Sequence, residues 1–351
     1  MTQPADVVVA GSGAVGSTIA LYLARAGLQV VVADPAPQGA NASGVAAGML
    51  APAFEALFDE KSRHHFLLLR DARDLWPPLA EGLGIALDRQ GALAVGSRAQ
   101  ATTWGTTLAG FGAEARVLTP EGTAAATRWL KGGWSVITAD DWRLDPIAAL
   151  QALRGEAERL GARWRPGRVL GLSGGKVALD PSGSLAAGKL IVASGASTDL
   201  LALAPELGGI SPIKGHILRA RSAWPDGGPV LRGAGVYLCP TPDELILGAS
   251  METGRGDLDI DRRIVADLIE RAGRLSPGLK DLDWRAAAGV RGETADGLPM
   301  AGWASARDVL LAVGARRNGW LLAPLIARTV LERMEDRAPS AAALAFDPAR
   351  P

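Results

Sequence analysis

The first 34 residues constrain the fold more than any other stretch of the chain. A short β-branched apolar run, DVVVA at residues 6–10, is typical of a strand buried on both faces, and the glycine-rich turn GSGAVG follows it directly. A helical pattern then ends near Gly27, and a second apolar run, QVVVAD, ends at Asp34. This order of strand, glycine turn, helix, strand and acid is the context that the dinucleotide-binding fingerprint requires.

Each glycine of the turn has a physical role in that interpretation. Gly11 permits the tight turn, Gly13 lets the backbone approach a pyrophosphate, and Gly16 allows the helix to pack closely on the strand. The N–H groups and positive dipole end of the helix favour phosphate, and Asp34 is placed to accept hydrogen bonds from a ribose. The motif by itself leaves NAD and FAD open, and a glycine turn in a cofactor-free α/β domain is the other interpretation.

Composition excludes several classes of partner. Lys plus Arg equals Asp plus Glu at 37 each, so nothing favours a nucleic acid or an anionic membrane. The single cysteine, Cys239, excludes an internal disulfide and a cysteine-based metal cluster, and is expected to be a small buried apolar residue. His64, His65 and His216 show no ligand-like spacing, so we expect no metal site. Without an apolar run long enough to span a bilayer, a cytoplasmic protein is expected.

The pattern along the chain predicts an α/β protein with a discontinuous nucleotide domain. A small-residue stretch, NASGVAAGMLAP at 41–52, precedes helical residues 53–84, in which Pro77-Pro78 forms a break. Asp145-Pro146 is a helix start, and an amphipathic helix is expected at 261–274. The predicted division is a Rossmann-like domain of residues 1–84, 142–214 and 286–351, with a second α+β substrate domain, built on a mixed or antiparallel sheet, of residues 85–141 and 215–285.

Taken with the fingerprint, NASGVAAGMLAP resembles the D-amino-acid oxidase superfamily of FAD proteins and, within it, the glycine oxidase family of thiamine biosynthesis. Three further stretches match in the same order: IVASGAS at 191–197, GVRGETADGLPMAG at 289–302 and GARRNGWLLAP at 314–324. The resemblance spans nearly the whole chain and implies FAD as the cofactor. The FAD should be noncovalent, because the C-terminal stretch lacks the cysteine through which some sarcosine-oxidase relatives attach flavin.

The resemblance also implies where FAD binds. The amides of Ala14 and Val15 would meet the pyrophosphate, Val169 would lie against the adenine, and residues 315–321 would face the electron-accepting edge of the flavin from a helix N-terminus. The expected cofactor-binding residues are Gly11, Gly13, Ala14, Val15, Gly16, Asp34, Pro35, Ala42, Ser43, Ala47, Gly48, Met49, Val169, Ser194, Gly195, Ala315, Arg316, Arg317, Asn318, Gly319, Trp320 and Leu321.

For the reaction, the resemblance implies an amino acid or amine such as glycine, sarcosine or a D-amino acid. Its Cα hydrogen would pass as hydride to flavin N5, the imine would hydrolyse to an oxo acid and ammonia, and dioxygen would become hydrogen peroxide. Arg291 matches the carboxylate-binding arginine, Arg317 a second arginine, and Tyr237 an aromatic hydroxyl above the flavin. The flavin is the reactive group, so no side chain is expected to act as a catalytic acid or base. A surface arginine at Arg291 and a packing tyrosine at Tyr237 are the alternatives.

The sequence departs from the family pattern at two places. Ala315 and Arg316 replace a histidine and an aromatic residue, so Arg316 should point to solvent or meet an additional acidic group of the substrate. Gly292 replaces a proline, and Glu293 could pair with Arg291 and weaken its attraction for a carboxylate. These changes keep two other functions open: a dehydrogenase that reduces a quinone or protein, and a flavin-binding subunit with a decayed pocket. An NAD-dependent dehydrogenase leaves residues 41–52 unexplained, and a homo-oligomer remains open.

Overall fold

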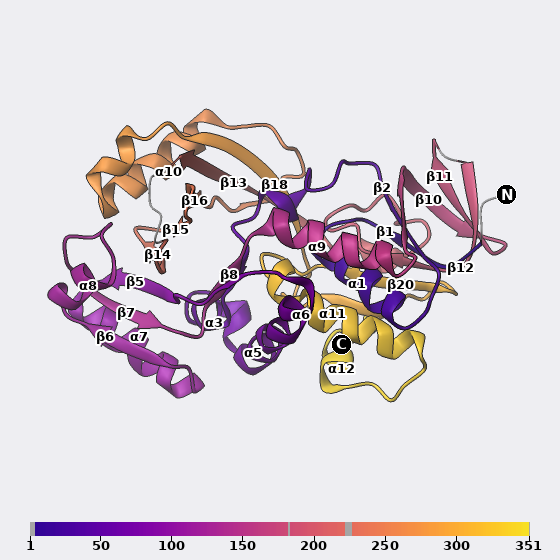
Figure 1. Ribbon diagram of the computed structural model, residues 1–351, viewed down its shortest axis with the longest axis horizontal. Coiled ribbons are helices and arrows are strands. Elements are labelled where there is room, and N and C mark those ends of the chain that lie inside the picture. The colour runs from indigo at the N-terminus through magenta and orange to yellow at the C-terminus, as the bar shows by residue number, and fades with distance from the viewer. Residues whose placement is uncertain (1–3, 182, 222–226, 351) are drawn as a thin grey trace.

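A computed structural model describes residues 4–181, 183–221 and 227–350 of the chain. Among these residues, the strands form an eight-stranded sheet, a nine-stranded sheet and a small three-stranded sheet. The two large sheets occupy opposite halves of the molecule in Figure 1, with the helices of residues 52–83 and 319–334 near its middle. None of the helices in the described ranges is long and apolar enough to cross a membrane.

The first sheet is built around the N-terminal strand. Strand β1 (Ala5–Ala10) lies parallel between β2 (Val30–Asp34) and β12 (Gly183–Val192), and its Val7, Val8 and Val9 are fully buried. The two-sided burial predicted from its apolar run is therefore confirmed. The other strands of this sheet are β9 (Arg163–Pro166), β10 (Arg168–Ser173), β11 (Lys176–Asp180), β19 (Met300–Trp303) and β20 (Val309–Val313).

Three helices cover one face of the first sheet. Helix α1 (Ala14–Arg25) starts at the glycine turn and packs against α9 (Pro146–Arg159) and α11 (Gly319–Met334) through a shared apolar core. The predicted helix start is confirmed, because Asp145 caps α9 by accepting hydrogen bonds from Ile147 N at 2.8 Å and Ala148 N at 3.0 Å. The short helix α12 (Ala341–Ala345) follows α11.

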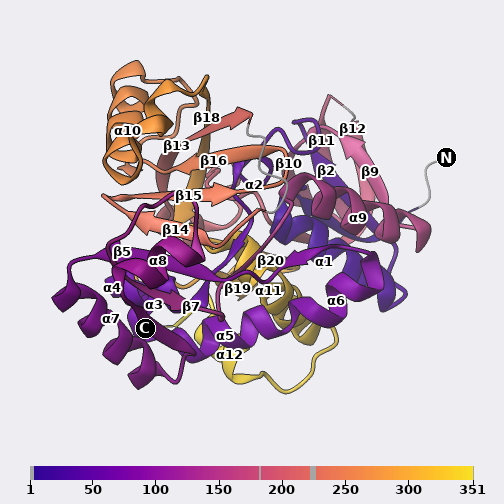
Figure 2. The same cartoon turned by 60° about the vertical axis from the view of Figure 1, so that its left-hand side comes forward.

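The second sheet is mixed, as predicted. Its strands run in the order β17-β13-β16-β15-β14-β5-β7-β6, with β18 on β13, and the pairing of β14 with β5 is parallel. Figure 2 shows α10 (Arg262–Leu275) on the outer side of β13, β15 and β16. The strands are β5 (Ala92–Gly96), β6 (Ala115–Leu118), β7 (Trp134–Thr138), β13 (Ser211–Arg221), β14 (Val230–Gly233), β15 (Val236–Pro240), β16 (Glu244–Gly248), β17 (Glu252–Thr253) and β18 (Arg285–Glu293). The remaining elements of this half are α7 (Arg98–Phe111), α8 (Pro120–Ala126) and η2 (Pro277–Asp281). The short helix η1 (Pro205–Gly209) instead packs against the first sheet through Leu207.

Short helices and a small sheet connect the two halves. The predicted break near Pro77-Pro78 lies at Leu75, between α5 and α6, and the two prolines occupy the first turn of α6, where missing N–H groups cost little. The connecting elements are α2 (Ala42–Val45), α3 (Pro52–Phe58), α4 (Glu60–Arg63), α5 (Phe66–Asp74), α6 (Trp76–Leu83), β3 (Met49–Leu50), β4 (Leu87–Asp88) and β8 (Trp142–Leu144).

Strand β18 joins the second sheet along its whole length. It pairs with β13 from Ser211↔Glu293 to Arg219↔Arg285, so residues 211–214 and 286–293 belong to this sheet rather than to the first. The small residues AAAG of β18 carry little apolar pattern, which is why the sequence did not show this pairing. The rest of the domain division remains a prediction.

Candidate active site

A cleft lies where the first sheet, the connecting helices and the second sheet meet. A cavity of about 380 Å³ opens at the carboxyl ends of β1 and β2 and at the start of α1. A larger cavity of about 630 Å³ lies against the second sheet. Ala42 and Arg291 line both cavities, so the two adjoin.

The smaller cavity is shaped by glycines that admit no side chain. Gly11 has a φ of +111°, and a Cβ there would lie 2.4 Å from the carbonyl oxygen of Ala193. A Cβ on Gly16 would lie 2.0 Å from the carbonyl oxygen of Gly11, so α1 can pack on the turn only with glycine at this position. A Cβ on Gly13 would lie 2.9 Å from Ser43 Oγ. The exposed backbone of this turn is what close approach by a phosphate group requires.

Asp34 connects the turn to the end of β2. Its Oδ2 accepts hydrogen bonds from Ser12 N at 2.7 Å and Ser12 Oγ at 2.8 Å, and its Oδ1 accepts one from Ala36 N at 2.9 Å. An ionised carboxylate has about four acceptor positions, so Asp34 can also receive a ribose hydroxyl. Asp34 lines the cavity, in agreement with the expected position.

The wall between the cavities is made of small residues. Gly48, with a φ of +72°, would place a Cβ 2.1 Å from the carbonyl oxygen of Leu144, so this segment requires glycine. Trp320 Nε1 donates a hydrogen bond of 3.0 Å to the carbonyl oxygen of Ser43 and joins the first turn of α11 to this wall. The positive end of the α11 dipole therefore faces the region between the cavities, where it would stabilise negative charge.

Nearly all of the predicted cofactor residues line the two cavities. Those around the smaller cavity are Gly11, Gly13, Ala14, Val15, Asp34, Pro35, Ala42, Ser43, Val169, Ser194, Gly195, Ala315, Arg316 and Gly319. Those around the larger one are Ala42, Ala47, Gly48, Met49, Arg317, Asn318 and Trp320. Gly16 lies outside both and acts through packing, and the Leu321 side chain is fully buried in the core beside the first sheet.

Arg291 reaches the larger cavity from β18. Its guanidinium lies over Gly215 of the neighbouring strand, where a Cβ would come within 1.7 Å of Nη2. Nη2 donates a hydrogen bond of 3.1 Å to the carbonyl oxygen of Ser250, and burial lowers the pKa of Arg291. Among the described residues, no carboxylate lies within 4.0 Å of this guanidinium. Its charge is therefore available to an anion in the cavity.

Tyr237 lies on the same sheet, opposite a second glycine. It pairs with Gly248 of β16, where a Cβ would lie 2.3 Å from the hydroxyl oxygen. Burial raises the pKa of Tyr237, so its hydroxyl stays neutral and can donate a hydrogen bond. Gly215 and Gly248 were missed by the sequence analysis, although an isolated glycine within a strand pattern is a signal of close approach.

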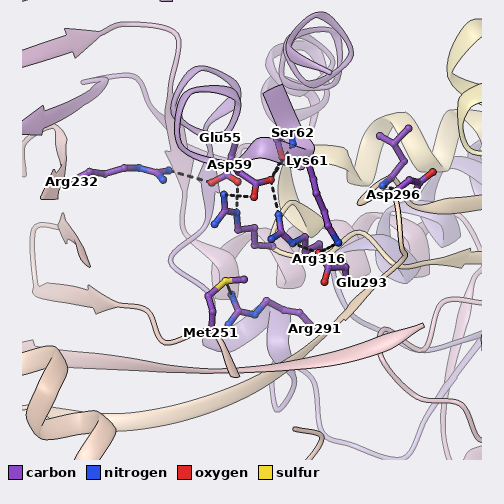
Figure 3. Close-up of polar contacts among 12 residues, drawn as sticks. Glu55, Asp59, Lys61, Ser62, Arg232, Met251, Arg291, Glu293, Asp296 and Arg316 are labelled. Atoms are coloured by element: carbon purple, nitrogen blue, oxygen red, sulfur yellow. Dashed lines mark hydrogen bonds and ion pairs between the residues drawn. The ribbon is translucent and has the colours of Figure 1, made fainter. Parts of the chain in front are cut away.

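A network of ion pairs at the edge of the cleft was also missed (Figure 3). Arg317 pairs with Glu55 and lies 3.7 Å from Asp59. Arg316 lies 2.6 Å from both Asp59 and Glu293. Burial opposes ionisation of Asp59, but hydrogen bonds from Arg316 and Ser62 lower its pKa. Glu55 and Asp59 come from α3 and the residue after it, in a stretch without any recognisable motif, and Glu293 ends β18, so only packing brings the three acids to Arg316 and Arg317.

The network corrects both expectations for the departures from the family pattern. Arg316 does not point to solvent, because its side chain is only 10% exposed. It is also not free to bind an acidic group of the substrate, because two carboxylates of the protein already bind it. Its φ of +51° turns the side chain toward Asp59, a backbone state that sequence pattern does not indicate. Glu293 pairs with Lys61 at 2.9 Å and with Arg316, not with Arg291. The attraction of Arg291 for a carboxylate is therefore not weakened by Glu293.

Asp141 supports the start of α3 behind the larger cavity. Its carboxylate accepts hydrogen bonds from Ala53 N at 2.8 Å and Phe54 N at 3.1 Å. Burial raises the pKa of Asp141 from 3.8 to about 7, against the opposite effect of Arg232 and these N–H groups. Its carboxyl group thus ionises more easily in the unfolded chain, so folding stability falls as the pH rises from 3.8 to about 7.

We expect Asp141→Asn to remove this part of the pH dependence. The free energy of unfolding of the variant minus that of the unmodified chain should increase steadily between pH 4 and 7 and stay constant above that range. Urea unfolding curves of both proteins across this range measure the difference. Parallel pH profiles would contradict the raised pKa.

These features define a class: an α/β protein that holds a dinucleotide at a glycine turn, beside a separate arginine-lined substrate cavity. Residues 6–333 match the family model DAO, FAD dependent oxidoreductase, and the chain belongs to that family. Its cofactor is FAD, and the protein is an enzyme of the oxidoreductase class. The side-chain-free glycine turn, the ribose-facing Asp34 and the small-residue wall fit this cofactor.

Several known proteins are similar over nearly the whole of this chain. Glycine oxidase of Geobacillus kaustophilus is 28% identical, over 95% of this chain and 94% of the relative, and a crystal structure titled glycine oxidase from that organism superposes with a TM-score of 0.89 at 26% identity, covering 100% of both chains. The bifunctional protein ThiO/ThiG of Synechocystis is 29% identical, over 100% of this chain but 54% of the relative. L-proline dehydrogenase from P. horikoshii shares the fold, with a TM-score of 0.84 at 21% identity over 100% of this chain and 98% of that one.

Proposed function

We propose that this enzyme oxidises a small amino acid or amine by FAD-dependent oxidative deamination, with dioxygen as the electron acceptor. The observation that carries the proposal is Arg291, a half-buried guanidinium in the larger cavity whose polar contacts among the described residues are a backbone carbonyl and a methionine sulfur. A guanidinium with two N–H edges is the group that binds a carboxylate bidentately. When bound, FAD supplies the two-electron acceptor for the hydrogen at the substrate Cα.

The protein supplies orientation. Arg291 would hold the substrate carboxylate against the second sheet, and the neutral hydroxyl of Tyr237 would donate a hydrogen bond to it. Two contacts to one carboxylate leave the amine and Cα in a defined direction, which lowers the entropic part of the barrier. The floor under both side chains is backbone, because Gly215 and Gly248 carry no Cβ. The substrate carboxylate can therefore lie close to the sheet.

The similarity to glycine oxidases supports glycine, sarcosine or a D-amino acid as the substrate class. A role in thiamine biosynthesis, a cytoplasmic location and homo-oligomerisation also belong to the proposal.

Anaerobic flavin reduction tests the proposal. The purified protein should be yellow, and glycine, sarcosine, D-alanine or D-proline should bleach its flavin absorbance without oxygen. Readmitted oxygen should restore the colour and produce hydrogen peroxide. Bleaching without peroxide, with reduction of a quinone or dye, would instead favour a dehydrogenase. A flavin that stays oxidised with every amino acid and amine tested would reject amine oxidation.

A further inference from the structure

The larger cavity extends beyond Arg291 and Tyr237 to a second arginine, Arg232. Arg232 and Tyr237 are paired across β14 and β15, so their side chains share one face of the sheet. Both line the cavity, whose far wall also contains Phe58 and Trp104, with ring centroids 5.2 Å apart. A molecule that contacts Tyr237 is thus next to a further cation on one side.

Arg232 is incompletely satisfied by the protein. Its side chain is 14% exposed, and its Nη2 lies 3.4 Å from Glu55 Oε1 and 3.9 Å from the sulfur of Met49. Its Nε is buried without a hydrogen-bond partner among the described residues. A guanidinium has five N–H donors, and among the described residues only Nη2 of Arg232 has hydrogen-bond partners, so Nη1 retains capacity for an anionic ligand.

The charge balance of the cavity leaves two positive charges in excess. Of the described residues, the ionisable ones lining it are Glu55, Tyr237 and the arginines 232, 291 and 317. Glu55 binds Arg317 more closely than it binds Arg232. Asp141 is the next acid near Arg232, but its oxygens face the backbone N–H groups of α3 rather than the cavity.

A substrate with one carboxylate neutralises Arg291 and leaves the other excess charge in place. Arginines 291, 317 and 232 against Glu55 then still amount to one uncompensated positive charge beside the bound carboxylate. An isolated buried charge is unfavourable, so a second anionic group on the ligand would stabilise the complex.

We propose that the preferred substrate carries two carboxylates, one bound by Arg291 and the other by Arg232. This inference rests on the proposed amine oxidation and narrows its substrate class to acidic amino acids and dicarboxylic secondary amines. Arg232 is then the residue that determines specificity, while Phe58 and Trp104 contact the apolar part of the substrate. The second carboxylate can lie on the amino-acid side chain or on an N-substituent, since both present the same anion.

Isosteric substrate pairs test the proposal. D-Glutamate is compared with D-glutamine, and iminodiacetate with its monoamide, each pair differing in one negative charge at nearly constant shape. In at least one pair, we expect kcat/KM for the acid to exceed that for the amide about tenfold or more. The pair that shows this difference identifies whether the second carboxylate lies on the amino-acid side chain or on the N-substituent. In Arg232→Met the ratio should fall close to one, and in Arg232→Lys part of it should return, because the charge is restored.

A matched control separates this effect from a change in net charge. Arg154→Met removes a positive charge from the exposed face of α9, where Arg154 pairs with Glu158, and should keep the ratio of the unmodified enzyme. Flavin absorbance confirms that each variant is folded and loaded. Ratios near one for both pairs in the unmodified enzyme, with neutral amino acids still reducing the flavin, would overturn the proposal and leave amine oxidation intact. Flavin that no substrate reduces would instead reject the proposed function itself.

Discussion

Replacing Arg291 by methionine should lower kcat/KM for every amino-acid substrate by a factor between about 30 and several thousand. Removing one partner of a buried, hydrogen-bonded charge pair costs about 2–5 kcal/mol, and each 1.4 kcal/mol is a factor of ten. The loss should be this large because, in the described cleft, no other arginine lies over Gly215. In the variant, the substrate carboxylate would therefore lie against the apolar methionine side chain. Steady-state kinetics with glycine and D-alanine measure the change.

Two further variants make this prediction specific. Arg291→Lys keeps the charge but not the planar pair of donors, so it should fall between the unmodified enzyme and the methionine variant. Arg285→Met, on the same strand but exposed, should leave kcat/KM within about twofold. All of these variants should remain yellow, since Arg291 contacts Ser250 and Met251 and not the glycine turn. Full activity of Arg291→Met would place the substrate carboxylate elsewhere.

Replacing Gly16 by valine should abolish FAD binding and destabilise the first sheet. A Cβ at this position would lie 2.0 Å from the carbonyl oxygen of Gly11, a contact that backbone atoms cannot relieve without moving α1 away from the turn. Overpacking of a core costs about 1–3 kcal/mol, and here the displaced helix is also the one whose N-terminus faces the phosphate site. The ratio of flavin to protein absorbance and the thermal midpoint should both fall.

A second glycine serves as the control for Gly16. Gly155 lies within α9, and a Cβ there would meet no atom within 4 Å. Gly155→Ala should retain FAD and gain up to about 1 kcal/mol of stability, because glycine in a helix interior has the larger entropic cost on folding. If Gly16→Val were purified with a full complement of FAD and an unchanged thermal midpoint, the close packing of α1 on the turn would be unnecessary for cofactor binding.

The parts of the site that the sequence predicted correctly are local ones. The strand, turn, helix and acid of the nucleotide site lie within 34 consecutive residues, and Asp34 meets Ser12 across only 22 positions. The predicted helix start at Asp145 and the amphipathic helix close to 261–274 depend on neighbours in the chain as well. Steric limits on glycine and the hydrogen bonds of helix caps act over a few residues, so a single sequence displays them directly.

The errors concern side chains whose partners are distant. Arg316 pairs with Asp59, which is 257 positions away in the chain, and this contact buries a side chain that was expected to be exposed. Glu293 pairs with Lys61, 232 positions away, instead of with Arg291 as expected. No feature of the sequence near Arg316 indicates Asp59 as its partner, and none near Glu293 indicates Lys61. The pairing of β18 with the second sheet was not predicted for the same reason, because its register with β13 is decided by packing of the whole second sheet.

The sequence by itself therefore determined the dinucleotide turn, its helix and its acid, because the geometry of a glycine turn is set by bonded neighbours and short-range repulsion. Only the tertiary structure decided which charges face the substrate. It placed Arg232 beside Tyr237 and 3.4 Å from Glu55, 177 positions away, and left Arg291 without a carboxylate partner among the described residues. Coulomb interactions depend on distance in space and on burial, and both exist only once the two sheets and the connecting helices have packed together.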